Sequence, residues 1–156
     1  MLGRGAIGDD GPMTPPRALL RVGWALHRAL WSLSGHRIGT TRPGAGVGTL
    51  FLVTIGRTTG ATRRNALFYI EDGGACIVVA SNGGAGVDPA WWKNLQATPE
   101  AAIELGRRTV PVRARLADRT ERARLWPRLV AANPPYATYQ AAVSTDIPVV
   151  LLEPRG

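Results

Sequence analysis

The segment best suited to chemistry is a basic, glycine-bearing turn between two apolar, β-rich runs. It reads Gly56-Arg57-Thr58-Thr59-Gly60-Ala61-Thr62-Arg63-Arg64. The glycines allow a tight turn that offers backbone N–H groups, and the hydroxyls and guanidiniums around it add donors and positive charge. Phosphate binds well to such a set, because backbone donors and arginine forks form short, charge-assisted hydrogen bonds. The glycine spacing differs from that of a P-loop, and a plain basic hairpin turn in solvent is the alternative interpretation.

A second glycine-bearing segment follows an apolar run further along the chain. It reads Ala80-Ser81-Asn82-Gly83-Gly84. A pair of glycines lets a flat ring approach the backbone closely, because no side chain stands in the way. The segment therefore offers a place for a planar ligand, although an ordinary polar loop would look the same.

Two aromatic pairs come after this loop. Trp91 and Trp92 lie just after Pro89, which is typical of the first turn of a short helix. Adjacent side chains on a helix point in different directions, so at most one Trp faces a site; alternatively, one fills the core and the other seals its edge. Tyr136 and Tyr139 are three residues apart, which places both on one face of a turn. Their phenols either are buried with satisfied hydroxyls or line a pocket as donors.

Other catalytic and metal-binding sets are missing from the sequence. His27 and His36 both lie in the N-terminal segment and the carboxylates are scattered, so we predict neither a Ser/His/Asp set nor a metal site. Cys76 stands alone in an apolar run, which excludes an internal disulfide and fits a reducing, cytoplasmic compartment. An enzyme with this set of residues needs a bound cofactor to carry its reaction.

The formal net charge of +8 favours anionic partners. A phosphorylated cofactor, an acidic membrane surface and nucleic acid all fit this charge. The arginines are scattered and match no nucleic-acid-binding motif, so we do not expect a nucleic-acid partner.

The N-terminal part is predicted to be separate from the main folded unit. Residues 1–13 are rich in glycine and predict a disordered tail, and residues 14–48 predict an amphipathic helix followed by a linker. The leucine stripe of this helix either packs on the domain or lies on an anionic membrane. Peripheral contact through residues 14–34 would place the protein at the inner face of the cell membrane. No run reaches the roughly 20 apolar residues that span a bilayer, so we expect a cytoplasmic protein.

Residues 49–156 have the pattern of one β-rich domain. Short apolar runs bounded by turn residues predict six strands, at 49–55, 65–71, 75–80, 101–105, 109–116 and 148–153. Helices are predicted between them, at 90–97, at 120–132 and briefly after Pro135. This order lacks a regular β-α-β alternation, so it indicates a mainly β (α+β) fold built as a small barrel rather than a parallel sheet.

Four motifs occur in an order that is specific as a set. They are Gly56-Arg57-x-Thr59-Gly60-x-x-Arg63, Val79-Ala80-Ser81-x-Gly83-Gly84, Pro89-Ala90-Trp91-Trp92-x-Asn94-Leu95 and Pro135-Tyr136-Ala137-x-Tyr139-Gln140. In these motifs, between about residues 50 and 154, the chain resembles the deazaflavin (coenzyme F420)-dependent nitroreductase family. The resemblance implies a six-stranded split β-barrel of the FMN-binding type. It also implies hydride transfer from reduced F420 to an electron-poor small molecule such as a quinone, an enone or a nitroaromatic.

The same resemblance implies a role for each motif. The phosphate and acidic tail of the cofactor would be held by Arg57, Thr58, Thr59, Gly60 and Arg63. The deazaflavin ring and its side chain would be lined by Arg64, Asn65, Ala66, Leu67, Phe68, Val79, Ala80, Ser81 and Asn82. The helix would close over the cofactor with Ala90, Trp91, Trp92, Lys93 and Asn94. The implied catalytic residue is Tyr136, which would supply a proton beside the ring, and the electron acceptor would meet Ser81, Trp91, Tyr136 and Tyr139.

Two departures from the family pattern affect the predicted cofactor. Relatives often carry lysine at the positions of Thr58 and Asn82, which predicts a weaker hold on a polyanionic tail here, with Arg64 as the compensating charge. FMN bound on the same barrel is the alternative cofactor, and a non-catalytic protein that binds a cofactor or a membrane surface is the alternative function. Small barrels of this kind often cover their strand edges with a second copy, so a homodimer is one expected assembly.

Overall fold

The computed structural model describes residues 46–156, which include the whole domain predicted at 49–156. The predicted tail at 1–13 and the predicted helix at 14–34 lie outside the described residues. Between residues 46 and 156, no helix is long and apolar enough to cross a membrane.

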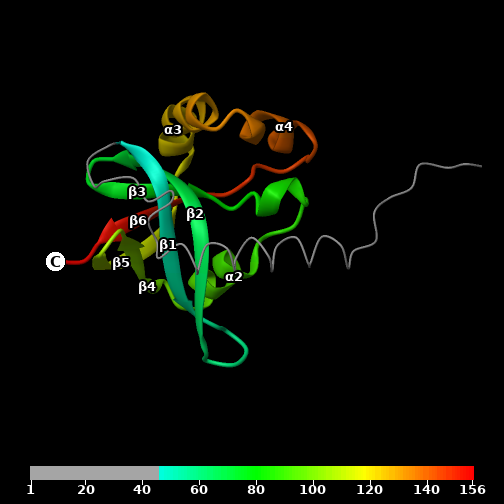
Figure 1. Cartoon of the computed structure of the whole chain (residues 1–156). Helices are drawn as coiled ribbons and strands as arrows, with labels where there is room; N and C mark the ends of the chain where they lie inside the picture. The colour runs from blue at the N-terminus through cyan, green and yellow to red at the C-terminus, as the bar shows by residue number, and fades with distance from the viewer. Residues whose placement is uncertain (1–45) are drawn as a thin grey trace, which may run out of the picture. The chain divides into compact units, whose positions relative to one another are not determined.

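Six antiparallel strands close into a barrel in the order β1-β2-β3-β6-β5-β4 (Figure 1). The strands are β1 (Val47–Ile55), β2 (Thr62–Asp72), β3 (Ala75–Val79), β4 (Glu100–Leu105), β5 (Arg108–Leu116) and β6 (Val149–Pro154). The helical segments are the 3-10 turn η1 (Asn82–Gly84) and the helices α2 (Ala90–Ala97), α3 (Arg119–Ala132) and α4 (Pro135–Ala141). The predicted six-stranded barrel with short helices is confirmed.

The first hairpin is longer than the sequence pattern predicts. β1 begins at Val47, inside the predicted linker, because Val47 pairs with Ile70 of β2. β2 begins at Thr62 instead of Asn65, since the ladder between the two strands continues to the pair Ile55–Thr62. The added residues are mostly polar, so backbone hydrogen bonding rather than apolar burial extends the strands, and hydrophobic alternation does not reveal them.

Alternation along the strands fills the barrel interior. Leu50 and Leu52 of β1 point inward and are fully buried, whereas Phe51 between them lies on the outer face. Trp91 and Trp92 of α2 belong to the same buried cluster as these leucines. Helix α2 therefore covers the barrel core, and the strand ends near it are held against a rigid apolar surface.

A second buried cluster lies between the outer face of the barrel and helices α3 and α4. Ile77 and Val79 of β3 pack in this cluster with Leu125 and Leu129 of α3. Tyr136 of α4 is also a member and is only 5% exposed. The helices are thus fixed on the barrel by apolar burial, the main favourable term in folding.

Charged residues fix the orientation of α3 on the first hairpin. The helix begins at a capping box, in which the Asp118 carboxylate accepts from the N–H of Glu121 and the Glu121 carboxylate accepts from the N–H of Asp118. Further along, Arg124 and Arg128 donate to the carboxylate of Asp72 at 2.8 and 2.6 Å. The hydrogen bond from Arg124 is the largest cause that lowers the pKa of Asp72 to about 2.

We expect the Asp72 ion pairs to contribute stability at neutral pH and to lose it in acid. The folded-state pKa of Asp72 lies below its ordinary value, so its contribution is complete above about pH 4 and disappears as the pH falls towards about 2. Unfolding of Asp72→Asn and the unmodified protein, followed by circular dichroism between pH 7 and pH 2, measures this difference. A difference that stays constant over this range would show that Asp72 acts through packing and not through charge.

The barrel is split along one edge of β2. This strand pairs with β3 only at Ile70–Asp72, although it pairs with β1 from Ile70 back to Thr62. The second edge of β2, from Thr62 to Tyr69, has no strand partner within the described residues. The open edge leads from the turn at residues 56–61 to the cluster around Tyr136, so both predicted ends of a cofactor site lie along one strand.

Candidate functional site

The turn between β1 and β2 is closed by its own hydrogen bonds. The N–H of Gly56 donates to the carbonyl of Ala61 at 2.7 Å, and the N–H of Gly60 donates to the carbonyl of Gly56 at 2.7 Å. A Cβ at Gly56 would lie only 3.1 Å from the Ala61 carbonyl oxygen and 3.2 Å from the Thr59 hydroxyl oxygen. Glycine is therefore needed at position 56 because the turn folds closely over it, which explains part of the motif in structural rather than ligand-binding terms.

The donors left over by this closure belong to exposed residues. The Thr59 hydroxyl already accepts from the N–H of Ala61 at 3.3 Å. The backbone N–H groups of Thr58 and Thr59 have no hydrogen-bond partner within residues 46–156, and both residues are exposed. Two neighbouring N–H groups on a tight turn form the type of concave donor site that binds an anion.

Arg57 and Arg63 at the turn carry positive charge that no carboxylate in residues 46–156 pairs with. Arg57, Arg63 and Lys93 are exposed, and in the described part of the chain none of them has a carboxylate partner. The Nε atom of Arg63 folds back to 3.6 Å from the position that a Gly56 Cβ would occupy. The structure therefore brings Arg57 and Arg63 together at the turn, as the phosphate-binding hypothesis requires.

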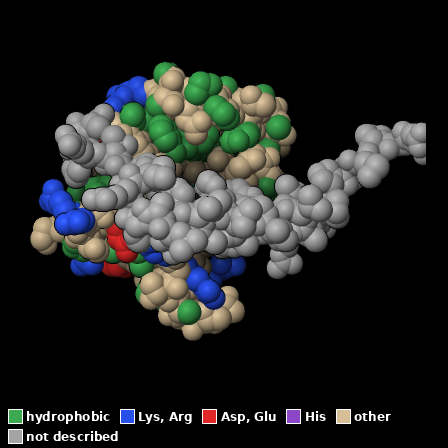
Figure 2. All heavy atoms as spheres, viewed as in Figure 1, with side chains coloured by type: hydrophobic (Ala, Val, Ile, Leu, Met, Phe, Trp, Pro, Cys, Tyr) green, Lys and Arg blue, Asp and Glu red, His purple; other side chains and the backbone are tan. Residues whose placement is uncertain are grey.

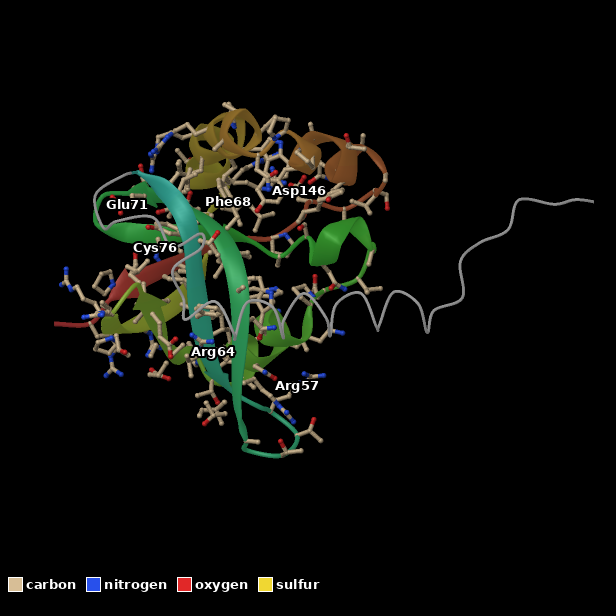
Figure 3. The ribbon with its side chains drawn as sticks, viewed as in Figure 1. Arg57, Arg64, Phe68, Glu71, Cys76 and Asp146 are labelled. Atoms are coloured by element: carbon tan, nitrogen blue, oxygen red, sulfur yellow. The ribbon has the colours of Figure 1, made fainter. Side chains whose placement is uncertain are left out.

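Arg64 lies elsewhere, on the outer face of the hairpin (Figure 3). Its guanidinium stacks on the ring of Phe51 at 3.4 Å from the centroid and forms a 2.5 Å ion pair with Glu104 of β4. Neighbouring residues on a strand point to opposite faces, so Arg63 and Arg64 cannot serve the same side. In this structure Arg64 is not brought beside Arg57, and it does not supply the compensating charge expected from the sequence.

Asn94 connects this turn to helix α2. Its carbonyl oxygen, Oδ1, accepts from the Arg57 backbone N–H at 3.1 Å and from Arg57 Nη1 at 3.2 Å. Its amide nitrogen, Nδ2, donates to the hydroxyl of Thr54 at 3.2 Å. Asn94 is 4% exposed and Thr54 is 1% exposed, so the bond between them is buried, whereas the two bonds to Arg57 are partly buried. Three of the four hydrogen-bonding positions of the carboxamide are thus used within the protein.

The predicted ring-lining residues of β2 divide between two faces. Asn65 and Leu67 point towards the barrel side, and Ala66 and Phe68 point to the opposite side. Phe68 is half-buried and packs against Tyr136. The strand therefore cannot present all four side chains to one ring, and only one alternate pair can face a ligand.

The loop after β3 adds residues from both faces as well. Val79 is buried against α3 and α4, whereas Ala80 belongs to the barrel core. Ser81 is half-buried and Asn82 is exposed. Asn82 has a left-handed φ of 49°, which asparagine tolerates better than most residues. Its residue type is thus explained by the loop conformation.

Both tryptophans of α2 are core residues. Trp91 is 5% exposed and Trp92 is 6% exposed, and their rings contact edge to face with centroids 6.5 Å apart. Both tryptophans pack in the core, so the structure favours the packing interpretation of this pair over one in which a Trp faces a site. On the same helix, Ala90 and Lys93 are exposed and face solvent.

Tyr136 is the centre of an aromatic cluster. Its ring centroid lies 6.4 Å from each of the ring centroids of Phe68, Trp126 and Tyr139. Burial raises the pKa of Tyr136 above its ordinary value, so the phenol is protonated at neutral pH. Figure 2 shows hydrophobic side chains gathered on the face over α3 and α4, around this cluster.

The glycine pair of the second loop packs against this cluster. A Cβ at Gly84 would lie 2.6 Å from Cδ1 of Tyr139, so the backbone of η1 touches the face of that ring. The flat ring expected beside the glycines is therefore, in this structure, a ring of the protein itself. Through this contact the loop at residues 81–84 and helix α4 are packed together.

A polar clamp that the sequence pattern did not predict holds the chain after α4. Gln140 accepts from Arg122 at 2.9 Å and from the N–H of Ile147 at 2.9 Å, and it donates to the carbonyl of Thr145 at 3.0 Å. A small hollow lies between this segment and the loop at 80–88, with Ser81 among its lining residues. Gln140 belongs to the fourth motif, where it follows the two tyrosines. A polar residue next to a predicted aromatic face is the signal from which its structural role could have been predicted.

The fold and the turn together define a class of protein: a split β-barrel with an anion-binding turn at one end of an open strand edge and an aromatic cluster at the other. Comparison with known sequences narrows this class, since residues 25–154 match the family model described as F420H(2)-dependent quinone reductase. The chain belongs to this family. The predicted resemblance to F420-dependent enzymes and the predicted cofactor, coenzyme F420, are confirmed. The activity in the description of the matching family is quinone reduction.

Individual relatives agree with the family match. The chain is 38% identical over 134 residues to the F420H(2)-dependent quinone reductase Rv1261c of Mycobacterium tuberculosis (strain ATCC 25618 / H37Rv), covering 83% of this chain and 89% of that one. It is 42% identical over 118 residues to Rv3178 of the same strain, which bears the same enzyme name in provisional form, covering 73% and 99% of the two chains.

A solved structure supports the fold assignment. The structure of an F420-H2 dependent reductase (FDR-A) superposes with a TM-score of 0.63 at 34% identity, covering 67% of this chain and 93% of that one. A second solved structure, described as a domain-swapped dimer, superposes with a TM-score of 0.64 at 28% identity and covers 87% of this chain and 99% of that one.

Proposed function

We propose that this protein reduces quinones with F420H2 and holds the phosphate and acidic tail of the cofactor at the turn of residues 56–61. The observation that carries the proposal is the pair Arg57 and Arg63, which have no carboxylate partner in the described part of the chain and lie at the turn with the unpaired N–H groups of Thr58 and Thr59. An anion fits this set, because no carboxylate of residues 46–156 neutralises it.

The opposite end of the open strand edge fits the ring and the acceptor. β2 rises about 3.3 Å per residue, so Phe68 lies about 16 Å from Arg63 along the strand. The two side chains point to opposite faces of β2, so a ligand that reaches both must cross its unpaired edge. In Figure 3 Arg57 marks the turn and Phe68 marks the end of the strand under α3 and α4. An extended ligand with a charged tail and an apolar ring matches this division of the surface into a basic and an aromatic part.

The chemistry comes from the deazaflavin ring, which supplies a hydride when the reduced cofactor is bound. The residues of this chain bind and orient the two reactants. Arg57 and Arg63 hold the tail, the aromatic cluster excludes water, and Tyr136 holds a proton on its phenol oxygen for the reduced acceptor. Nitroaromatics and enones are further electron-poor acceptors that we propose for the same surface.

Cofactor titration tests the proposal directly. Fluorescence titration of the purified protein with F420 should give saturable binding that weakens as salt increases, because the tail contacts are electrostatic. FMN, titrated in parallel, should bind more weakly, since it lacks the acidic tail. Quinone reduction by F420H2 at a rate no higher than that without protein would reject the catalytic part and favour a non-catalytic binding protein.

Replacing Tyr136 with phenylalanine is expected to slow turnover without loss of cofactor. The phenol is the only part removed, and a positioned proton donor contributes about 10-fold or more to a rate when solvent can partly replace it. Tyr139→Phe is the matched control on the same helix. Turnover of F420H2 with a quinone gives kcat, and titration gives the dissociation constant. A large loss of affinity in Tyr136→Phe would make Tyr136 a binding residue instead.

Membrane contact and assembly are proposed for the full chain. The basic amphipathic pattern of residues 14–34 supports peripheral binding to anionic lipid at the inner face of the cell membrane, where apolar quinones dissolve. Flotation of the full chain with anionic vesicles and with neutral vesicles compares its binding to the two kinds of lipid surface. Equal recovery with both would reject binding to anionic lipid.

The open edge of β2 supports a homodimer, because an unpaired strand edge can be covered by a second copy of the chain. Sedimentation of the full chain measures this assembly.

A further inference from the structure

We infer that Asn94 is a positioning residue for Arg57 and is not itself a ligand of the cofactor. The inference rests on the proposed function, because it concerns how the anion-binding turn is held ready for the tail. The family motif implies that the whole helix segment Ala90–Asn94 closes over the cofactor. The hydrogen bonds of this chain assign a different task to its last residue.

Three of the four hydrogen-bonding positions of the Asn94 carboxamide are already used. Oδ1 accepts from the Arg57 backbone N–H and from Arg57 Nη1, and Nδ2 donates to Thr54. The residue is 4% exposed, so a ligand in solvent has little access to either atom. An amide that is buried and satisfied in this way has a structural task, since breaking its bonds leaves buried polar groups without partners.

The bonds act on both parts of Arg57 that matter for a ligand. The backbone contact fixes the Gly56–Arg57 peptide, one residue before the N–H of the exposed Thr58. The side-chain contact fixes one nitrogen of the guanidinium and leaves the remaining donors of the fork for an anion. A carboxamide suits this position because it orients the arginine without neutralising its charge, whereas a carboxylate would form an ion pair with it.

Thr54 anchors the carboxamide to the barrel. Thr54 points inward from β1 and is 1% exposed, so its hydroxyl is a fixed acceptor for Asn94 Nδ2. Because both contacting groups of Arg57 are donors, the amide oxygen must face Arg57, and the amide nitrogen then donates to Thr54. Helix α2, strand β1 and the turn are thereby joined at one buried side chain.

The first test needs no cofactor. In the ligand-free protein, Asn94→Ala should increase the hydrogen-exchange rate of the Arg57 amide by about tenfold or more, because the amide loses its buried acceptor. Asn94→Asp keeps an acceptor oxygen for the Arg57 N–H and should restore the slow exchange. Thr54→Val removes the anchor of the carboxamide but leaves its acceptor oxygen, so it should raise the same exchange rate less than Asn94→Ala does. An Arg57 amide that exchanges equally fast in the unmodified protein and in Asn94→Ala would overturn the inference.

The second test is a double-mutant cycle on F420 affinity. Asn94→Ala should weaken F420 binding about 5- to 10-fold in the unmodified protein and less than about 2-fold in the Arg57→Ala background. Binding of a deazaflavin with the ring and sugar chain but no phosphate should stay within about 2-fold in Asn94→Ala, because that ligand does not reach the turn. Asn94→Asp should bind F420 weakly despite its slow amide exchange, since its charge neutralises Arg57.

The outcomes separate this inference from the proposed function. Additive losses in the cycle would show that Asn94 contacts the cofactor itself, and equal losses for both ligands would show a general structural role; either result would overturn the positioning assignment. Failure of the unmodified protein to bind F420 would instead reject the proposed function, while the exchange measurement would still report on the contact between Asn94 and Arg57.

Discussion

Replacing Arg63 with alanine is expected to weaken F420 binding by about 10- to 100-fold, the value of one hydrogen-bonded charge contact. Arg63 folds over the turn, and within residues 46–156 it has no carboxylate that would take up its charge. Its removal therefore costs ligand contacts and leaves the rest of the hairpin unchanged. Fluorescence titration at two salt concentrations measures the loss, which should shrink at high salt because the missing interaction is electrostatic.

Arg64→Ala is the matched control for this experiment. The two arginines are neighbours on β2, but Arg64 stacks on Phe51 and pairs with Glu104 on the other face. Its loss should change F420 affinity by less than about 2-fold and should affect stability only slightly, as is usual for an exposed ion pair. A loss equal to that of Arg63→Ala would place the cofactor tail on the outer face of the hairpin and contradict the proposed site.

The fold could be predicted because its elements are local patterns. Strand residues alternate, turns contain glycine or proline, and the predicted strands and helices coincide with the observed ones to within a few residues. The order of the elements then excludes a parallel sheet. The start of β2 could not be predicted because a polar strand such as Thr62–Arg64 is held by pairing with β1, which depends on register rather than on its own composition.

The side from which each residue acts could not be predicted from spacing alone. Arg63 and Arg64 look equivalent in a sequence of basic residues, and only the strand register places Glu104 beside one of them. The hydrogen-bond partners of Asn94 could not be predicted from spacing either. Its partners Thr54 and Arg57 are about 40 residues away in the chain, and the buried contact exists only because α2 packs back on β1.

The aromatic residues show how a site motif can also be a packing motif. Two tryptophans on one helix left open whether one of them faces a ligand or both pack, and the barrel interior buries both. The glycine pair suggested an approaching cofactor ring, and the ring found there is that of Tyr139. In both cases the residue type was interpreted correctly as requiring close apolar contact, whereas the partner depended on tertiary structure.

That contact leads to the second large effect, expected for Gly84→Ala. The new Cβ would lie 2.6 Å from Tyr139 Cδ1, closer than atoms pack, so the ring or the loop must move. Gly84 also has a φ of 81°, where an L-residue is strained. Strain of about 1–2 kcal/mol and overpacking of about 1–3 kcal/mol together predict a destabilisation of about 2–5 kcal/mol, measured by urea unfolding.

Gly83→Ala separates the two causes. Gly83 has a similar φ of 63°, but no atom lies within 4 Å of the position that a Cβ would occupy there, so only the backbone strain applies and the expected cost is about 1–2 kcal/mol. The excess in Gly84→Ala then measures the contact with Tyr139. If Tyr139 lines the acceptor site, the same variant should raise the KM for quinone while F420 affinity, which depends on the distant turn, stays within about 2-fold. Equal destabilisation of the two variants would mean that the loop shifts freely and that η1 does not hold helix α4 in place.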